Sequence, residues 1–199
     1  MKLLLLRHAA TAWNLEKRVQ GQIDQPLCDT GRQALNALRL PPELRQWRWY
    51  SSPLQRARET ARLLGIDEPR LEPALIEMSW GDWEGEILKP LRKRLGAVMR
   101  DNEARGIDFC PPGGESPRQV QVRLQPWLKE IAGGGGNSAA VAHKGIIRCI
   151  YALATGWDMR GECPVDFAWD ALHQFELTPV GKLTNSYRPI PLTDPKLSS

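Results

Sequence analysis

The stretch Lys2-Leu3-Leu4-Leu5-Leu6-Arg7-His8 decides the fold, because a short apolar run ends directly at a cation and an imidazole. A continuous apolar run of this length is typical of a strand buried on both faces of a parallel sheet. The run is too short for the apolar part of a signal peptide or for the roughly 18 residues of a membrane span. We therefore expect a buried strand over Lys2–Arg7, with His8 directly after it.

A second buried strand is expected over Ser138–Ala142, and it is also followed directly by a histidine, His143. Ligands of parallel sheets bind outside the carboxyl ends of the strands, so both histidines fall where a site is expected. Further strands are predicted at Trp47–Ser51 and at residues 71–76. Between the strands the pattern predicts helices that begin at Thr30-Gly31-Arg32-Gln33, at Ser52-Pro53, at Glu86 (to Arg105), at Ser116-Pro117-Arg118-Gln119 and at Gly145 (to Thr155), with Thr30, Ser52 and Ser116 as the expected N-terminal caps.

The alternation of strands and helices predicts an α/β fold with three layers, a mostly parallel sheet covered by helices on both faces. Pro179-Val180-Gly181 predicts a hairpin near the C-terminus, and the last dozen residues read as a loose tail. His173 is interpreted as an edge-strand residue without chemistry. The chain shows no internal repeat and no break in composition, so residues 1–199 are expected to form one domain.

Composition narrows the class of protein. The formal net charge of +4 is spread over 199 residues without a basic run, which argues against nucleic acid as a partner. No apolar stretch suggests a membrane. The four cysteines contain no Cys-x-x-Cys pair, so we expect free thiols, a cytoplasmic location and no structural zinc. A homodimer is left open.

Arg7-His8 suggests phosphoryl chemistry. A neutral imidazole can attack phosphorus and carry the group covalently, and neighbouring cations keep its lone pair available by lowering its pKa. The alternative for an isolated Arg-His pair is a core histidine with satisfied hydrogen bonds. Phosphate-binding glycine loops, a nucleophile elbow and a cysteine-phosphatase pattern are all missing from the sequence.

Further motifs follow in order, and with them the chain resembles the histidine phosphatase superfamily, also called phosphoglycerate-mutase-like. The resemblance runs from residue 3 to about residue 150. The motifs that carry it are Arg7-His8-Ala9-Ala10-Thr11-Ala12-Trp13-Asn14, Arg18-Val19-Gln20-Gly21, Ser51-Ser52-Pro53-Leu54-Gln55-Arg56, Leu75-Ile76-Glu77 with Gly81-Asp82-Trp83-Glu84-Gly85, and Val141-Ala142-His143-Lys144-Gly145.

The resemblance implies five catalytic residues. His8 is the implied nucleophile, and Arg7, Arg56 and His143 are the implied phosphate clamp. Glu77 is the implied general acid that protonates the leaving oxygen and then activates water. Such a residue must start protonated, so its pocket must raise its pKa. The clamp supplies the positive charge, so neither a metal ion nor another cofactor is expected.

Substrate contacts are implied at positions around these five residues. The expected ligand is a small phosphomonoester. Loop residues 111–116 resemble a loop of short bacterial members such as α-ribazole phosphatases, which places Glu115 near the substrate or at the helix start. The candidate substrate-binding residues are Asn14, Gln20, Gly21, Trp83, Glu115 and Lys144.

The sequence departs from the family pattern at two places. The usual Arg-His-Gly-Glu-Thr is Arg-His-Ala9-Ala10-Thr here, and the usual His-Gly-Gly is His-Lys144-Gly. These changes put the rate in question more than the reaction class. The favoured function is a phosphohistidine-forming phosphatase, and the alternatives are a phosphoglycerate-type mutase and a catalytically weak phosphoryl-binding protein.

Overall fold

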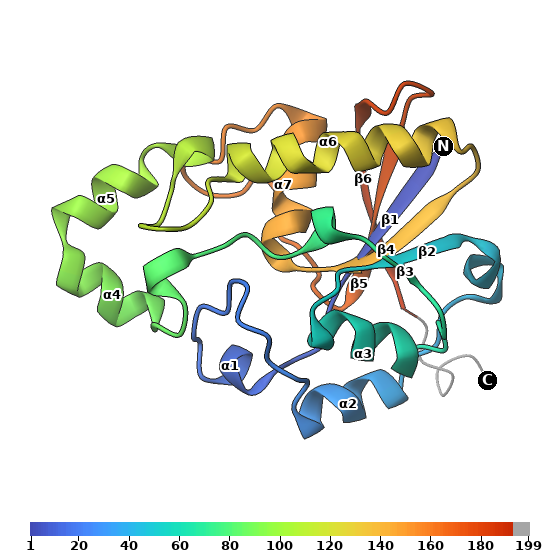
Figure 1. Cartoon of the computed structure of the whole chain (residues 1–199), viewed down its shortest axis with the longest axis horizontal. Coiled ribbons are helices and arrows are strands. Elements are labelled where there is room, and N and C mark those ends of the chain that lie inside the picture. Colours follow the sequence, from blue (N-terminus) through green and yellow to red (C-terminus); the bar gives the residue numbers. More distant parts are fainter. Residues whose placement is uncertain (193–199) are drawn as a thin grey trace.

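The computed structural model describes residues 1–192 of the chain, and its centre is one six-stranded sheet (Figure 1). The strands lie in the order β3-β2-β4-β1-β5-β6. Their bounds are β1 Lys2–Arg7, β2 Arg48–Ser51, β3 Arg70–Leu71, β4 Ser138–Ala142, β5 Ala171–Leu177 and β6 Leu183–Pro191.

Parallel pairing joins the first four strands of this order, and antiparallel pairing joins the last two to the sheet. β1 pairs in parallel with β4, and β4 with β2, so the carboxyl ends of these three strands meet at one edge. β5 runs antiparallel to β1 and forms a hairpin with β6. The expected α/β fold with a mostly parallel sheet and a C-terminal hairpin is confirmed.

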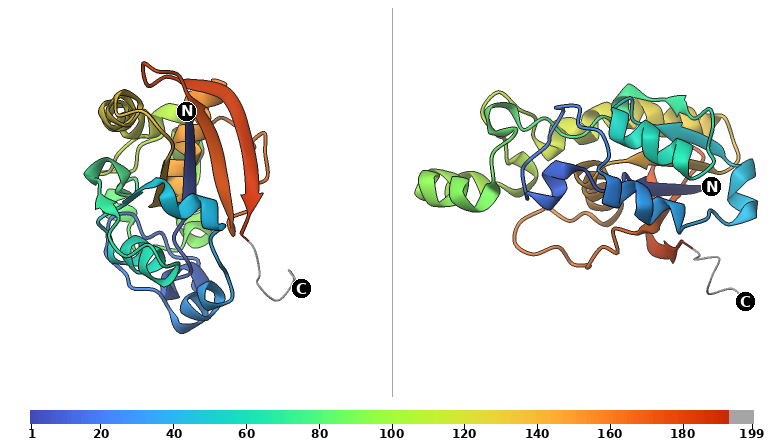
Figure 2. Two further views of the ribbon diagram at one scale, coloured as in Figure 1. Left: turned by 90° about the vertical axis from the view of Figure 1, so that its right-hand side faces the viewer. Right: turned by 90° about the horizontal axis from the view of Figure 1, so that it is seen from below.

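The leucines of β1 explain why both faces of the sheet are covered. Successive side chains of a strand point to opposite faces. Leu3 and Leu5 belong to the apolar cluster that includes α6 and α7, whereas Leu4 and Leu6 belong to the cluster that includes α2 and α3. All four are buried, and Figures 1 and 2 show the two helix layers on either side of the sheet.

Helices α4 and α5 stand apart from these layers (Figures 1 and 2). A single helix was expected from Glu86 to Arg105, and that expectation is wrong. Gly96 divides it with φ 54° and ψ −118°, a conformation that essentially only glycine adopts. The helix bounds are α1 Ala12–Leu15, α2 Asp29–Asn36, α3 Gln55–Leu63, α4 Leu88–Leu95, α5 Ala97–Glu103, α6 Pro117–Gly133 and α7 Lys144–Thr155, with 3₁₀ turns at Pro42–Gln46, Pro73–Leu75, Gly81–Trp83 and Gly106–Asp108.

One of the three predicted helix caps is confirmed. Ser116 caps α6 in a reciprocal capping box with Gln119. The predicted cap by Thr30 is wrong, because α2 begins one residue earlier, at Asp29, after Cys28. The predicted cap by Ser52 is also wrong, because α3 begins at Gln55 and the hydroxyl of Ser52 contacts His143 instead.

Three predictions about strands need correction. The strand expected over residues 71–76 is reduced to Arg70–Leu71, because Pro73 begins a 3₁₀ turn. β6 continues to Pro191, so the tail is shorter than expected, and residues 193–199 of that prediction lie outside the described part of the chain. His173 lies on β5 between two strands and is fully buried, not at an edge. Within residues 1–192, no helix is both long and apolar enough to span a membrane.

The central position of β1 predicts a large effect of shortening one of its leucines. Leu5→Ala should lower the free energy of unfolding by about 2 to 5 kcal/mol, because Leu5 is fully buried and a cavity would remain. Leu15→Ala, at a side chain that is 61% exposed, is the control and should change it little. Urea denaturation measures both, and equal losses in the two variants would contradict the assigned burial.

Candidate active site

Adjacent parallel strands bring the two sequence-predicted histidines together. Arg7 at the end of β1 pairs with Ala142 at the end of β4, so the residues that follow, His8 and His143, are neighbours. Their ring centroids lie 5.1 Å apart. Arg56 reaches the same place from α3, which follows the neighbouring strand β2. The expected position of both histidines at the carboxyl ends of adjacent parallel strands is confirmed, and the expectation that a site lies there stays a prediction.

His8 is held with one ring nitrogen engaged and the other available. Its Nδ1 lies 2.7 Å from the carbonyl oxygen of Ala9, which can only accept, so Nδ1 carries the hydrogen. Burial, together with the positive charges of Arg56 and Arg7, lowers the pKa of His8 well below its usual range. The neutral ring therefore presents an unprotonated Nε2, which is the form that a nucleophile requires.

His143 is buried and has protein partners on both ring nitrogens. The Nε of Arg56 donates to His143 Nδ1 at 3.3 Å, and His143 Nε2 lies 2.8 Å from the hydroxyl of Ser52. Burial and the nearby charges, including those of Arg56 and Arg7, lower the pKa of His143 well below its usual range. The implied donation from His143 to a phosphoryl oxygen stays a prediction, since Ser52 occupies Nε2 in this structure.

The two arginines of the implied clamp differ in how they are held. Arg56 is fully buried, and its terminal nitrogens donate to the carbonyl oxygens of Gly21 at 2.7 Å and Ile23 at 2.9 Å. Arg7 lies with its guanidinium carbon 5.5 Å from the ring centroid of Trp169, and its Nε is buried without a hydrogen-bond partner. No carboxylate among the described residues forms an ion pair with Arg7, so its positive charge is available to an anion in the cavity that it lines.

Glu77 lies with its carboxylate against two backbone amides. Met78 N donates to Oε1 at 2.9 Å, and Gly145 N donates to Oε2 at 3.1 Å. A Cβ on Gly145 would lie 2.4 Å from Oε1, so only glycine allows this approach. Burial raises the pKa of Glu77, and the two amides and the nearby arginines only partly offset it. A carboxyl group with a raised pKa suits proton donation.

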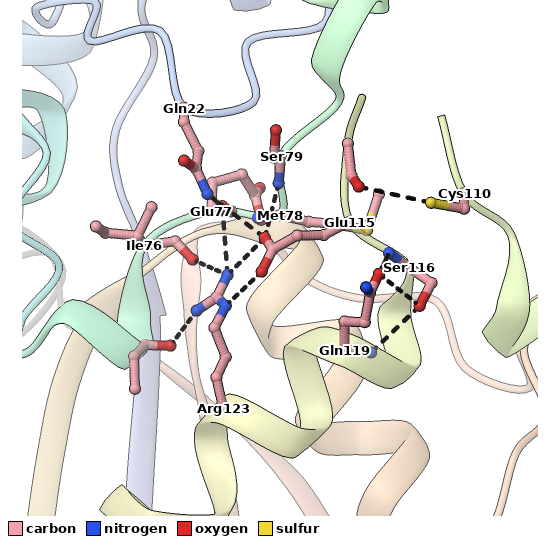
Figure 3. Close-up of polar contacts among 12 residues, drawn as sticks. Gln22, Ile76, Glu77, Met78, Ser79, Cys110, Glu115, Ser116, Gln119 and Arg123 are labelled. Atoms are coloured by element: carbon pink, nitrogen blue, oxygen red, sulfur yellow. Dashed lines mark hydrogen bonds and ion pairs between the residues drawn. The ribbon is translucent and has the colours of Figure 1, made fainter. Parts of the chain in front are cut away.

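Arg123 of α6 holds the segment that carries Glu77 (Figure 3). Its guanidinium donates to the carbonyl oxygens of Ala74, Ile76 (2.7 Å) and Glu77 (3.4 Å). It also forms a forked ion pair with Glu115, at 2.9 Å and 3.2 Å. Three of these five contacts fix the backbone around Glu77, because the planar guanidinium presents its donors in a rigid array.

Glu115 faces the protein and not the cavity. Besides pairing with Arg123, its Oε2 accepts from Ser79 N at 3.0 Å and from the side-chain amide of Gln22 at 3.4 Å (Figure 3). Glu115 was expected either to contact the substrate or to support the helix start, and the structure favours a supporting role. The segment that Glu115 supports is the one that carries Glu77, because Ser116 and Gln119 cap the helix start by themselves.

Glu84 joins the two loops that border the site. Its carboxylate accepts from the backbone amides of Gln22, Ile23 and Trp80 at 2.9 to 3.1 Å. Gly21 has φ 52°, and a Cβ there would lie 2.0 Å from a Glu84 oxygen, so glycine is required. The Gly21 carbonyl oxygen is thereby positioned to accept from Arg56.

A cavity of about 890 Å³ opens onto the site. Asn14 and Gln20 line it, and both are anchored through Thr11, which donates to the side-chain oxygen of each. Most of the predicted site residues share this cavity; those that line it are Arg7, His8, Asn14, Gln20, Gly21, Arg56, Glu77 and Lys144.

Three predicted site residues do not line the cavity: His143, Glu115 and Trp83. Trp83 is buried in a small apolar cluster with Leu91 and Met99. Its predicted substrate contact is therefore not seen, and Trp80 takes a place on the cavity wall instead. Among residues 1–192 no three His, Cys, Asp or Glu side chains gather so that they could hold a metal ion.

The departures from the family pattern are accommodated by main-chain groups. Ala9 N donates to the hydroxyl of Thr60 at 3.0 Å, and Ala10 O accepts from Cys28 N at 3.0 Å. Ala9 is not among the non-glycine residues with positive φ, so glycine is not required there. The turn after His8 is thus held without a glutamate side chain.

Two residues of the site were missed by reasoning from the sequence, Ser52 and Arg123. Ser52 was interpreted as a helix cap, and its position after a strand end was the available signal. The sequence around Arg123 does not indicate its role, because its backbone partners lie 46 to 49 residues away along the chain. Only Glu115, at eight residues, is near it in sequence.

The family model of the histidine phosphatase superfamily (branch 1) matches residues 3–178. A match over this length, together with the arrangement of His8, Arg7, Arg56 and Glu77, defines the class of protein. The chain belongs to the histidine phosphatase superfamily, as the ordered motifs predicted.

Individual relatives and a solved structure agree with this family assignment. Phosphoglycerate mutase-like protein 4 of Arabidopsis thaliana is 32% identical over 162 residues, which are 77% of this chain and 70% of that protein. A metal-independent phosphoserine phosphatase of the same plant is 32% identical over 163 residues, 77% and 68% of the two chains. A mycobacterial glucosyl-3-phosphoglycerate phosphatase, solved as a complex with VO3, matches with TM-score 0.73 and 27% identity, over 94% of this chain and 96% of that one.

The buried histidines predict how stability responds to acid. Burial lowers the pKa of His8 and His143, and lowers that of His173 to about 4. Each binds fewer protons in the folded than in the unfolded state below about pH 6.5, so the stability present above that pH is lost as the pH falls.

We expect the free energy of unfolding to fall between about pH 7 and pH 5, by up to roughly 1.4 kcal/mol per pH unit and histidine, reduced by the opposite contribution of Glu77, whose raised pKa stabilises the fold as the pH falls. Denaturant titrations at a series of pH values measure this. NMR of the three imidazoles serves as the direct control, with all three neutral at about pH 6. Ordinary titration of His8 and His143 near 6.5 would contradict the assigned environment.

Proposed function

We propose that this chain hydrolyses small phosphomonoesters through a phosphohistidine at His8. The observation that carries the proposal is the state of the His8 ring, with Nδ1–H committed to the Ala9 carbonyl and Nε2 unprotonated beside Arg7 and Arg56. A carboxyl group with a raised pKa, Glu77, lines the same cavity. Nucleophile, cations and acid are the parts that phosphoryl transfer needs.

In the first step the Nε2 lone pair of His8 forms a bond to phosphorus while the bond from phosphorus to the leaving oxygen breaks. Glu77 donates its proton to that oxygen, so the alcohol leaves neutral. Arg7 and Arg56 stabilise the negative charge on the phosphoryl oxygens. This electrostatic stabilisation is strongest where water is excluded. The products of this step are the free alcohol, phosphohistidine and the Glu77 carboxylate.

In the second step the Glu77 carboxylate accepts a proton from water as the water oxygen bonds to phosphorus. The bond from phosphorus to His8 Nε2 breaks, and inorganic phosphate is released. Glu77 is again protonated and His8 again neutral. The cycle therefore returns every group to its starting state, with Glu77 acting as acid and then as base.

Arg7 and Arg56 of the implied clamp supply the positive charge that a metal ion would otherwise provide, and on that basis we propose a metal-independent reaction. Both line the cavity. The name of the metal-independent phosphoserine phosphatase among the relatives supports this proposal. Hydrolysis is preferred to a mutase reaction because two of the reported relatives are named phosphatases.

The particular substrate and the location in the cell are also proposals. α-Ribazole phosphate remains one candidate, although Glu115 of the loop that suggested it faces Arg123 instead of the cavity. A cytoplasmic location is supported by the four free cysteines, none of which is paired in a disulfide.

A phosphoenzyme test checks the nucleophile. Purified protein should release phosphate from an aryl phosphate in excess EDTA and form an acid-labile, base-stable phosphoenzyme. His8→Ala should abolish the phosphoenzyme, whereas the control His173→Gln, at a histidine that does not line the cavity, should retain it. An absolute requirement for Mg²⁺, or a phosphoenzyme that persists in His8→Ala, would refute the mechanism.

Leaving-group dependence checks the role of Glu77. Glu77→Gln should lower kcat for alkyl phosphates by about 10²- to 10⁴-fold, the usual contribution of a general acid, and affect aryl phosphates much less because their leaving groups need no proton. Glu176→Gln, at an exposed residue of β5, is the matched control. Equal losses on alkyl and aryl phosphates would exclude Glu77 as the acid.

A further inference from the structure

The cavity contains more positive charge than one phosphoryl group requires. Its lining carries eight cationic side chains and two carboxylates, Glu77 and Glu103. Arg18 and Arg92 have ion-pair partners, Glu16 and Glu103 respectively. The cations left without a carboxylate partner among residues 1–192, beyond the implied clamp, are Lys17, Arg100, Lys144 and Arg148.

Two of these cations share one face of one helix. Lys144 and Arg148 are four residues apart at the start of α7, and residues at this spacing are neighbours on a helix surface. α7 begins directly after His143, so this face adjoins the catalytic strand ends. The loop residues Met159 and Gly161 line the cavity with them.

Aromatic rings hold both side chains without neutralising their charge. Lys144 Nζ lies 5.1 Å from the ring centroid of Trp169, and the guanidinium carbon of Arg148 lies 5.2 Å from that of Trp157. The guanidinium carbon of Arg7 also lies 5.5 Å from the ring centroid of Trp169. Cation–π contacts of this kind orient a cation and leave its hydrogen-bond donors available.

Arg148 also has a donor without an acceptor. Its Nε is inaccessible to solvent and has no hydrogen-bond partner among the described residues. A donor that solvent cannot reach is also closed to a ligand in the cavity, so an anion there would interact with the charge of the whole guanidinium, which no carboxylate among the described residues offsets. Repulsion from Arg7 and Arg148, after burial, lowers the pKa of Lys144, and an anion between these cations would relieve that repulsion.

We propose that Lys144 and Arg148 form a subsite for a second anionic group of the substrate, a carboxylate or phosphate carried by the leaving alcohol. The substrate class would then be phosphomonoesters with a second negative charge. This inference rests on the proposed function, because the ligand is a substrate only if the protein hydrolyses it. Binding of the second anion itself does not require hydrolysis.

Lys17 and Arg100 do not form such a subsite. Both are exposed, as Lys144 is, but unlike Lys144 neither has an aromatic ring within contact distance among the described cation–π pairs. Exposed and unheld cations bind anions weakly, because solvent screens their charge and ordering their side chains costs entropy.

Calorimetric titration with phosphonates tests the subsite without chemistry. The probes are alkylphosphonates with two, four or six carbons, each ending in a methyl group, a carboxylate or a second phosphonate. The series is needed because the second group must span from the site of His8 to α7. At the best length, the second anion should tighten binding by about tenfold or more, as expected for a charge-assisted hydrogen bond.

Charge-removing variants assign the effect to residues. Arg148→Met and Lys144→Met should each reduce the preference for the second anion by about tenfold and retain most of the apolar stem. Arg45→Met, at an exposed arginine outside the cavity, removes the same charge and should leave the preference unchanged. Comparison of carboxylate and phosphonate ends shows which anion the subsite prefers.

The outcomes separate this inference from the proposed function. A preference below threefold at every length, or an equal weakening of methyl-ended and anionic probes in both variants, overturns the subsite. Phosphate release from aryl phosphates under EDTA would leave the hydrolase proposal standing in that case. Conversely, a strong preference lost in Arg148→Met supports the subsite even where no ester is hydrolysed.

Discussion

The parallel pairing of β1 with β4 is the constraint on which the rest of the structure depends. It places Arg7 opposite Ala142, and so brings His8 and His143 to one edge of the sheet with ring centroids 5.1 Å apart. The charged residues at the two ends of β1 fix the register, because a shift by one residue would bring Lys2 or Arg7 into the buried run of leucines. The placement of His8, the proposed nucleophile, is therefore a consequence of core packing.

Charge is the second constraint. The proposed mechanism requires a neutral His8 and a protonated Glu77, and both residues lie near Arg7 and Arg56. The arginines and burial act in the same direction on the pKa of His8, which falls. They act in opposite directions on Glu77, where burial prevails and the pKa rises. One environment thus gives His8 and Glu77 the protonation states that the proposed mechanism requires, and the Arg123 contacts keep Glu77 in that environment.

The sequence predicted the parts of this structure that depend on short-range pattern. The apolar runs before His8 and His143 indicated the strands, and the ordered motifs indicated the family.

The break at Gly96 was missed because an isolated glycine in a helical pattern is usually tolerated. The orientation of Glu115 and the contacts of Arg123 could not be predicted, since they depend on how α6 packs against a loop some 40 to 50 residues earlier. His173 was misjudged because the position of β5 inside the sheet depends on where β6 pairs.

The identity of the phosphorylated nitrogen tests the central claim most directly. The hydrogen bond from Nδ1 to the Ala9 carbonyl leaves only Nε2 of His8 free to attack. NMR of the trapped phosphoenzyme, prepared with ¹⁵N-labelled histidine, distinguishes the two nitrogens by their coupling to phosphorus. The account predicts a phosphoryl group on Nε2 of His8. Phosphorylation at Nδ1, or on any other residue, would contradict it.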